Sequence, residues 1–437
     1  MKKRWLGVLM ATVVAASALA GCSSNNAGGG TAASTAASEA SQAAEATSEA
    51  SKSAEAETTE EAAPAGEGVD ASNIKVGIFY IGDENEGYTE AHMKGIDGMQ
   101  EMLGLSDDQI IEKTNIADNE AAYDAAKDLV DQGCNIVFAN SFGHEDYLMQ
   151  CAQEYPDIEF CHATGYQAAM SGLSNFHNYF TAIYQARYVS GIVAGMKINE
   201  MIEKGDITED DAMIGYVGAF PFAEVISGFT SFYLGAKSVC PSVTMTVRYT
   251  NSWGDLALEK EVAKQLIADG CVLISQHSDT VGPATACQEE GVPCVGYNVS
   301  MISAAPDSAL TSATINLAPY YAYAVQSVID GTPIDVDWAK GYEEGVNLIT
   351  ELNEGVVAEG TKEAVDAIES QLKAGTFHVF DTSTFTVGGE TLEDLIAAGG
   401  DNERYADYVS DGYFHESELA SAPAFDLIID GIDAQVD

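Results

Sequence analysis

After residue 72 the chain alternates short apolar runs with amphipathic stretches. The apolar runs are bounded by Gly, Asp or Asn, which is typical of buried parallel strands. The predicted strands are 75–80, 109–113, 135–140, 158–162 and 175–180. Between them, apolar positions recur every three or four residues, so the pattern predicts helices at 89–103, 120–132 and 145–154. This strand–helix order predicts a doubly wound α/β lobe with a mostly parallel sheet.

The same order begins again at residue 182. Predicted helices are 182–199, 224–236, 256–269 and 281–290, and predicted strands are 213–217, 243–249, 272–276 and 292–297. A faint internal repeat accompanies them, because DQGCNIVF at 131–138 matches ADGCVLIS at 268–275. Two similar lobes predict a two-lobed clamshell whose ligand lies where the strand ends of both lobes meet.

The predicted organisation assigns 72–180 and 299–335 to lobe 1. Lobe 2 is expected to comprise 181–298 and 336–437, the latter including a C-terminal extension. Within that part, 364–374 reads as a helix and 376–386 as short strands. The three expected crossings between lobes, near 180, 298 and 335, would form a hinge.

The N-terminus has the features of an export signal. A basic start, Met1 to Arg4, precedes an apolar run at 5–20, which is shorter than the ~20 residues that span a bilayer. Leu19-Ala20-Gly21-Cys22 resembles a bacterial lipobox, which implies cleavage of 1–21 and lipidation of Cys22; the alternative is an ordinary signal peptide with a chance Cys. Residues 22–71 are mostly Ala, Ser, Thr, Glu and Gly, a composition typical of a flexible tether. We therefore expect an extracytoplasmic protein that is held at the bacterial cell membrane by lipid alone.

Charge and cysteine content narrow the function. The 437 residues include 19 Lys and Arg against 68 Asp and Glu, a net charge of −49, which disfavours nucleic acids and anionic lipid surfaces as partners. Seven cysteines follow Cys22, an odd number that cannot all pair. Their apolar surroundings predict buried thiols, with one or two disulfides left open. Neither a Cys-x-x-Cys nor a zinc-type spacing occurs, so no metal or cofactor is predicted.

The loops after the predicted strands are rich in polar and aromatic residues. They carry the candidate ligand contacts Tyr88, Ser141, Phe142, Trp253, Asp279 and Asn298. Tyr88 and Trp253, one from each lobe, are placed to sandwich a planar ring, which is worth ~0.5–1.5 kcal/mol beyond burial. Ser141, Asp255, Ser278 and Asp279 also precede predicted helices, so N-capping is an alternative role for each.

Several segments, taken in order and spacing, resemble the basic membrane protein family of lipoproteins, which includes purine nucleoside receptors. The resemblance covers about 75–331 and rests on the following segments: Gly87-Tyr-Thr-Glu-Ala-His92, Ser141-Phe-Gly143, Phe160-Cys-His-Ala-Thr-Gly165, Ile214-Gly-Tyr-Val-Gly-Ala-Phe-Pro221, Asn251-Ser-Trp-Gly-Asp255, Gln276-His-Ser-Asp279, Val295-Gly-Tyr297, Leu310-Thr311 and Pro319-Tyr-Tyr321. It implies a type I substrate-binding protein of an ABC importer, with purine nucleosides or bases as ligands and a permease as partner.

The resemblance also implies site residues. The family's stacking aromatics fall on Tyr88 and Trp253, and its polar contacts fall near Ser141, His162, Asp279 and Asn298, with Asn316 a further match. Tyr88 stands where relatives often carry Trp or Phe, Asn298 where many carry Asp, and Leu317 where Trp is frequent. These departures argue against ribose recognition and leave a free base or another small heterocycle open as the ligand. His162 has a second interpretation as a hydrogen-bonded core histidine.

Two other functions remain as alternatives. A binder of another small ligand, such as a sugar or a signalling molecule, would use the same stacking residues. A nucleoside-hydrolysing enzyme would need an acid–base pair, for which His277 and Asp279 are the nearest candidates. No nucleophile-elbow, P-loop or zinc-protease motif is present, so we expect a binding protein and not an enzyme.

Overall fold

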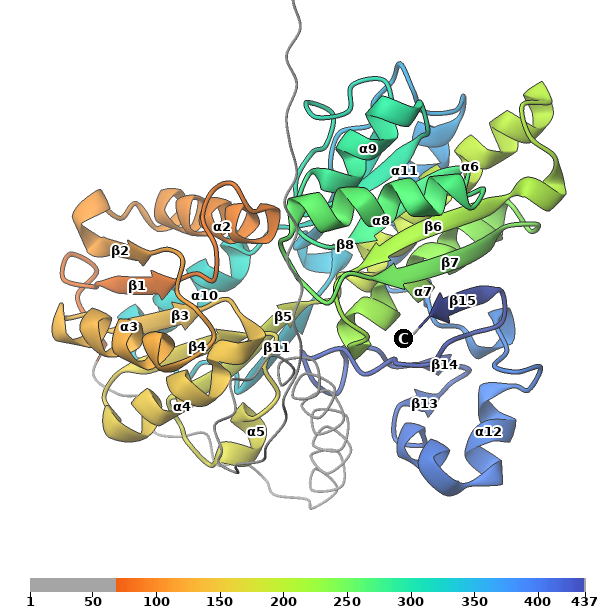
Figure 1. Cartoon of the computed structure of the whole chain (residues 1–437). Helices are drawn as coiled ribbons and strands as arrows, with labels where there is room; N and C mark the ends of the chain where they lie inside the picture. Colours follow the sequence, from red (N-terminus) through yellow and green to blue (C-terminus); the bar gives the residue numbers. More distant parts are fainter. Residues whose placement is uncertain (1–67, 436–437) are drawn as a thin grey trace, which may run out of the picture.

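Two α/β lobes, each built on its own sheet, lie side by side in the computed structural model, which describes residues 68–435 (Figure 1). The predicted signal peptide, Cys22 and nearly all of the predicted tether lie outside the described residues. Within this part of the chain, none of the helices is both long and apolar enough to cross a membrane.

The first lobe contains a six-stranded, all-parallel sheet in the order β2-β1-β3-β4-β5-β11. Its strands are β1 (Val76–Phe79), β2 (Ile110–Lys113), β3 (Ile136–Ala139), β4 (Glu159–Ala163), β5 (Phe176–Thr181) and β11 (Asp337–Lys340). Its helices are α2 (Gly87–Leu103), α3 (Glu120–Asp131), α4 (Glu145–Glu154), α5 (Ala168–Ser171) and α10 (Ala318–Asp330).

The second lobe contains a seven-stranded sheet in the order β15-β7-β6-β8-β9-β10-β12, in which only β12 is antiparallel. Its strands are β6 (Met213–Gly218), β7 (Thr244–Tyr249), β8 (Leu273–His277), β9 (Cys294–Tyr297), β10 (Ala309–Ile315), β12 (Asn347–Ile349) and β15 (Ile432–Gln435). Its helices are α6 (Tyr184–Lys204), α7 (Ala223–Val239), α8 (Leu256–Ala268), α9 (Gly282–Glu290) and α11 (Thr361–Lys373).

The predicted α/β fold with two doubly wound lobes is confirmed. Five strands of each sheet follow one order, β2-β1-β3-β4-β5 in the first lobe and β7-β6-β8-β9-β10 in the second. The matched segments of the internal repeat lead into β3 and β8, which hold the same place in these two orders. In each, a glycine at positive φ, Gly133 at 88° and Gly270 at 101°, ends the helix region before a buried cysteine. The repeat therefore reflects a repeated topology.

Alternating side chains bury both faces of the first sheet. On one face, Phe79 and Val137 pack against Ala126 and Leu129 of α3. The next residues along the same strands point to the other face, where α2 and α10 lie. Gly98 makes the approach of α2 to α10 close, because a Cβ there would lie 2.7 Å from the Cβ of Ala318. Both faces are covered by helices, which explains the nearly continuous apolar strands.

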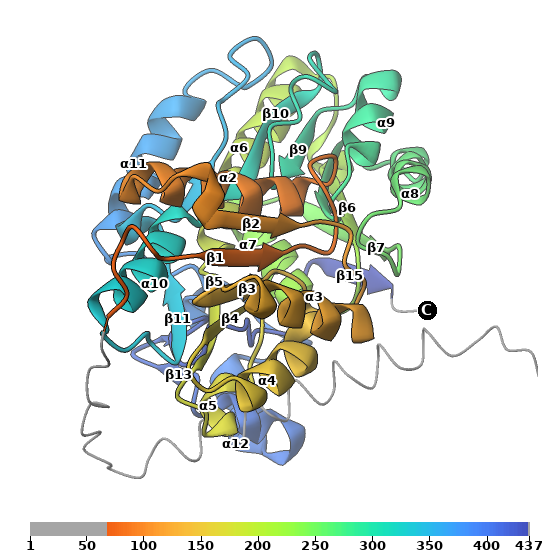
Figure 2. The same cartoon turned by 90° about the vertical axis from the view of Figure 1, so that its left-hand side faces the viewer.

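Two strands lie in the opposite lobe from the one we predicted. β10 falls in the segment assigned to lobe 1 but pairs with β9 of the second sheet. β11 falls in the segment assigned to lobe 2 but pairs with β5 of the first sheet, and Figure 2 shows it with α10 beside the earlier strands of that lobe. The chain therefore crosses between the lobes after β5, after β10 and after β11. An apolar run identifies a strand, whereas its partner depends on tertiary packing.

The C-terminal extension differs in part from expectation. The helix predicted at 364–374 corresponds to α11, but 376–386 forms a loop with one 3-10 turn, Thr382–Thr384, in place of short strands. The aromatic residues that suggested strands serve as packing groups, since Phe380 and Phe385 both contact the ring of Phe425. The remaining elements are α12 (Leu392–Ala398), β13 (Val409–Ser410) and β14 (Tyr413–Phe414).

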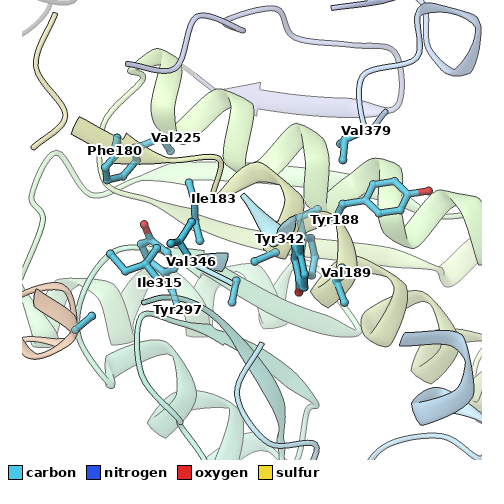
Figure 3. Close-up of a cluster of buried hydrophobic side chains, with 14 of the residues drawn as sticks. Phe180, Ile183, Tyr188, Val189, Val225, Tyr297, Ile315, Tyr342, Val346 and Val379 are labelled. Atoms are coloured by element: carbon cyan, nitrogen blue, oxygen red, sulfur yellow. The ribbon is translucent and has the colours of Figure 1, made fainter. Parts of the chain in front are cut away.

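An apolar cluster joins the three crossings. Phe180 and Ile183 come from the first crossing, Ile315 from the second, and Tyr342 and Val346 from the third, and all are buried (Figure 3). The crossings are thus packed into one core at the base of the two lobes. This arrangement positions the loops at the carboxyl ends of both sheets opposite one another.

Candidate ligand-binding site

A cavity of about 450 Å³ lies between the lobes, at the carboxyl ends of strands from both sheets. The first lobe lines it with the loop after β1 and with Asn140, Ser141 and Phe142 after β3. The second lobe contributes Glu224, Trp253, Asp279 and Tyr297, from the ends of β6, β7, β8 and β9. This is the position expected for a ligand in a two-lobed α/β protein.

Five of the eight predicted contact residues line this cavity: Tyr88, Ser141, Phe142, Trp253 and Asp279. They come from four loops that are distant in the sequence and adjacent in the fold. These five residues lie close together because the segments that follow parallel strands meet at one edge of the sheet.

The other three predicted residues lie behind the cavity wall. His162 is fully buried, and its Nε2 lies 2.7 Å from the backbone oxygen of Ser141. Asn298 donates from Nδ2 to Oδ1 of Asp279 at 2.8 Å. Asn316 belongs to the second crossing, where its Oδ1 accepts from the backbone N–H of Ala318 at 3.2 Å. Each side chain positions a neighbouring segment and does not line the cavity.

Aromatic side chains from both lobes form much of the wall. The hydroxyl of Tyr88 donates to the backbone oxygen of Asn140 at 2.7 Å, which fixes this ring against the end of β3. Trp253 lies 5.4 Å from the ring of Phe220, between centroids. Phe142 of the first lobe lies 6.1 Å from Phe222 of the second. Flat apolar surfaces therefore face the cavity from either side.

The lobes touch directly beside the cavity. The backbone N–H of Gly87, at the start of α2, donates to the backbone oxygen of Asp279 at 3.1 Å. A Cβ at Gly87 would lie 3.2 Å from that oxygen and 3.3 Å from the Cβ of Asn298. The absence of a side chain at Gly87 allows this close approach.

Acidic groups dominate the electrostatics of the cavity. Burial raises the pKa of Asp279 well above its usual value, and the nearby carboxylates of Glu86, Glu259 and Glu224 add to this, against the opposing hydrogen bond from Asn298. Burial raises the pKa of Glu224 to about 7, with the charge of Arg187 opposing. A cleft with several crowded carboxyl groups favours hydrogen-bond donors over anions as ligands.

Sequence reasoning missed Glu224, Tyr297 and Arg187. Glu224 opens α7 directly after β6, so the rule used for the other strand ends would have included it. Arg187 is buried in α6, with its guanidinium 3.5 Å above the ring of Tyr297 and its Nη1 donating to the backbone oxygen of Gln276 at 2.7 Å. Nothing in the local pattern of α6 signals that this arginine supports the floor of the cleft.

The alternative role as a helix N-cap, open for Ser141, Asp255, Ser278 and Asp279, is confirmed for Asp255 alone. Asp255 caps α8, where its side chain accepts from the backbone N–H of Leu258. Ser141 makes no side-chain cap bond at the turn it precedes, and neither Ser278 nor Asp279 is the capping residue of α9. Asp279 therefore has a side chain available to the cavity.

The candidate acid–base pair is not assembled. His277 is fully buried and does not line the cavity, and burial lowers its pKa well below the usual value. Across residues 68–435, His, Cys, Asp and Glu side chains do not gather in groups of three or more that could hold a metal ion. The seven cysteines of this range are all buried and unpaired, as free thiols.

Comparisons with known proteins agree on the class. The model of the family described as "ABC transporter substrate-binding protein PnrA-like" matches residues 74–376. A purine-binding protein of Brucella abortus is 31% identical over 75% of this chain and 90% of its own length. A putative ABC transporter glucose-binding protein of Haloferax volcanii is 32% identical over 78% of this chain and 81% of its own length.

Solved structures support the fold. An ABC transporter solute-binding protein from Aeropyrum pernix has a TM-score of 0.59 at 15% identity, covering 76% of this chain and 98% of that chain. One from Conexibacter woesei has a TM-score of 0.57 at 21% identity, covering 70% of this chain and 98% of that chain. At these identities the likeness concerns the architecture of the two lobes alone.

Proposed function

Because the chain belongs to the PnrA-like family of ABC transporter substrate-binding proteins, which are not enzymes, we propose that its ligand is a purine nucleoside or purine base. One observation carries the proposal: Tyr88 of the first lobe and Trp253 of the second line the same cavity. A planar heterocycle between these rings would gain stacking energy from both lobes. The purine-binding relative from Brucella abortus supports the same ligand class.

The polar atoms of the cavity suit such a ring. The cavity volume of about 450 Å³ lies within the ~300–1,000 Å³ range of small-molecule sites. Ser141 and Asp279 provide hydroxyl and carboxyl groups at the edge of the aromatic walls. We propose these residues, with Phe142, as ligand contacts, and His162, Asn298 and Asn316 as residues that act through their neighbours.

The mode of action follows from ligand contacts to two lobes. A ligand that touches both lobes binds the closed arrangement more tightly than the open one, so it shifts the population toward closure. In this proposal the closed form delivers the ligand to an ABC permease outside the cytoplasm. A lipid on Cys22 and the tether at 22–71 would keep the lobes near the membrane.

A sugar is the second candidate ligand. The relative from Haloferax volcanii is described as a putative glucose-binding protein at nearly the same identity. Aromatic faces also pack on sugar rings, so Tyr88 and Trp253 do not exclude this ligand.

Titration calorimetry with adenine, adenosine, guanosine and glucose separates the two candidates. We expect micromolar or tighter binding of at least one purine and none of glucose; glucose binding without purine binding would overturn the proposal. A second readout is tryptophan fluorescence in a Trp338→Phe background, since Trp338 lies buried in β11, away from the cavity. In the chain cleaved before Cys22, which lacks Trp5, purine should quench the remaining Trp253, and the matched Trp253→Phe variant should lose the signal while still binding.

A further inference from the structure

We propose that Glu224 is a specificity-determining residue whose neutral form favours a ring edge carrying a hydrogen-bond donor beside an acceptor, as adenine has, over an edge with two donors, and which disfavours an anionic group in either form. The inference rests on the proposed function and deepens it, because it names which purines the cleft prefers.

The geometry places the side chain of Glu224 at the cavity. The residue lies in the first turn of α7 and lines the cavity, yet only 18% of its side chain is exposed. Its Oε1 lies 3.3 Å from Nε2 of His277. Within residues 68–435 the other oxygen, Oε2, makes no hydrogen bond. One oxygen of the carboxyl group is thus held by His277, and the side chain as a whole borders the cavity that a ligand would enter.

His277, which contacts Glu224, determines which oxygen of the Glu224 carboxyl group carries a proton. Nδ1 of His277 is buried without a hydrogen-bond partner in the described part of the chain. If Nδ1 carried the ring proton, a buried N–H donor would be unsatisfied, which is costly. With the proton on Nε2, His277 donates to Oε1 of Glu224. A proton bound by the carboxyl group then sits on Oε2.

Other ionisable groups surround this carboxyl on every side. Arg187 comes from α6, Tyr216 from β6, Asp279 from the end of β8, Tyr297 from β9 and Tyr88 from the first lobe. Burial is the largest influence and raises the pKa of Glu224 to about 7, while Arg187 opposes it. The group therefore changes between its neutral and ionised forms near neutral pH.

The two forms recognise different ring edges. A neutral carboxyl group presents an O–H donor and a carbonyl acceptor, which match the ring nitrogen and amino group of adenine. An ionised carboxylate presents acceptors only and matches the two adjacent N–H donors of guanine. The residues lining the cavity include several carboxyl groups and no Lys, Arg or His, so a phosphate group would find no cation to neutralise it there and nucleotides are disfavoured.

Calorimetry with adenine, guanine and AMP at pH 6 and pH 8 tests the inference. The neutral fraction of a group with a pKa near 7 falls roughly tenfold over this interval, so adenine affinity should fall about tenfold while guanine affinity should not fall. AMP should bind at least about tenfold more weakly than adenosine in the same series.

The Glu224→Gln variant holds a donor and an acceptor at every pH. We expect adenine affinity within about threefold of the wild type at pH 6, no dependence on pH, and a loss of guanine binding at pH 8. Glu84→Gln is the matched control, because Glu84 is exposed and lies outside the cavity lining; it should behave as the wild type.

The outcomes separate this inference from the proposed function. If purines bind but Glu224→Gln leaves the pH profile and the adenine-to-guanine ratio unchanged, the inference is wrong and the purine proposal stands. If adenine, guanine and their nucleosides all fail to bind the wild type, the inference and the proposed function are both wrong.

Discussion

The two lobes share one strand order but use their buried carboxyl groups differently. In the first lobe, both oxygens of Glu86 accept backbone N–H groups, from Tyr88 at 2.7 Å and Thr89 at 2.9 Å, and so cap α2. Glu145 accepts from the backbone N–H of Gln167 and from Nδ2 of Asn178, both at 2.9 Å. Hydrogen-bond donors of the protein itself therefore occupy these carboxylates.

In the second lobe, carboxyl oxygens remain available. Asn298 occupies one oxygen of Asp279, and His277 lies beside one oxygen of Glu224. Both residues line the cavity between the lobes. The comparison teaches that a repeated topology does not repeat its chemistry: the first lobe supplies a structurally fixed wall, and the second supplies groups free to select a ligand.

The largest expected effect tests the structural role of the first lobe. Glu145→Ala removes the acceptor for Gln167 and Asn178 in a buried position, so we expect the free energy of unfolding to fall by about 3 kcal/mol. Urea denaturation followed by circular dichroism measures it. Glu101→Ala, an exposed change on α2, is the control and should shift stability by less than about 0.5 kcal/mol. A loss no larger than that of the control would contradict the assignment of Glu145 to structure.

The next effect concerns the second lobe, where we expect the carboxyl group of Asp279 to lower the free energy of unfolding. Because burial and neighbouring acids raise the folded-state pKa of Asp279, the native state keeps its proton at a pH where the unfolded state has lost it. Stability attributable to this group therefore falls as pH rises above about 4. Asp279→Asn should be more stable than the wild type at pH 8, on the order of 1 kcal/mol, with a smaller difference at pH 4.

Thermal melts at the two pH values measure this difference. The matched change Asp157→Asn, at an exposed position before β4, should show no such dependence. Ligand affinity of Asp279→Asn should stay within about threefold of the wild type, because the side-chain amide keeps the donor and the acceptor of a neutral carboxyl group. A variant that is less stable than the wild type at pH 8 would mean that Asp279 serves the fold, as Glu145 does.

The smallest effect concerns the contact that joins the lobes. A Cβ at Gly87 would press on the backbone oxygen of Asp279 in the closed arrangement, so Gly87→Ala should weaken ligand binding about threefold. Alanine favours the helix relative to glycine by up to ~1 kcal/mol, so thermal stability should stay level or rise. Gly355→Ala is the control, because its new methyl group would meet no atom closer than 3.7 Å and the residue lies outside the cavity lining. Equal affinity of both variants would show that closure does not depend on this contact.

The sequence by itself determined the alternation of strands and helices and therefore the fold class, because hydrophobic periodicity is a local property. It also located Tyr88, Phe142 and Trp253 in loops that meet, since the carboxyl ends of parallel strands share one edge. The internal repeat marked by Gly133 and Gly270 anticipated two lobes of one topology.

Tertiary structure alone decided which strands pair and which side chains reach the cavity. β10 and β11 exchange lobes relative to expectation because pairing depends on contacts between distant segments. His162 lies near the end of β4 and Asn298 directly follows β9, yet packing buries them behind Ser141 and Asp279. Glu224 gains its raised pKa only from burial, which distant segments of both lobes create together, and this combination is not visible in any local stretch of the chain.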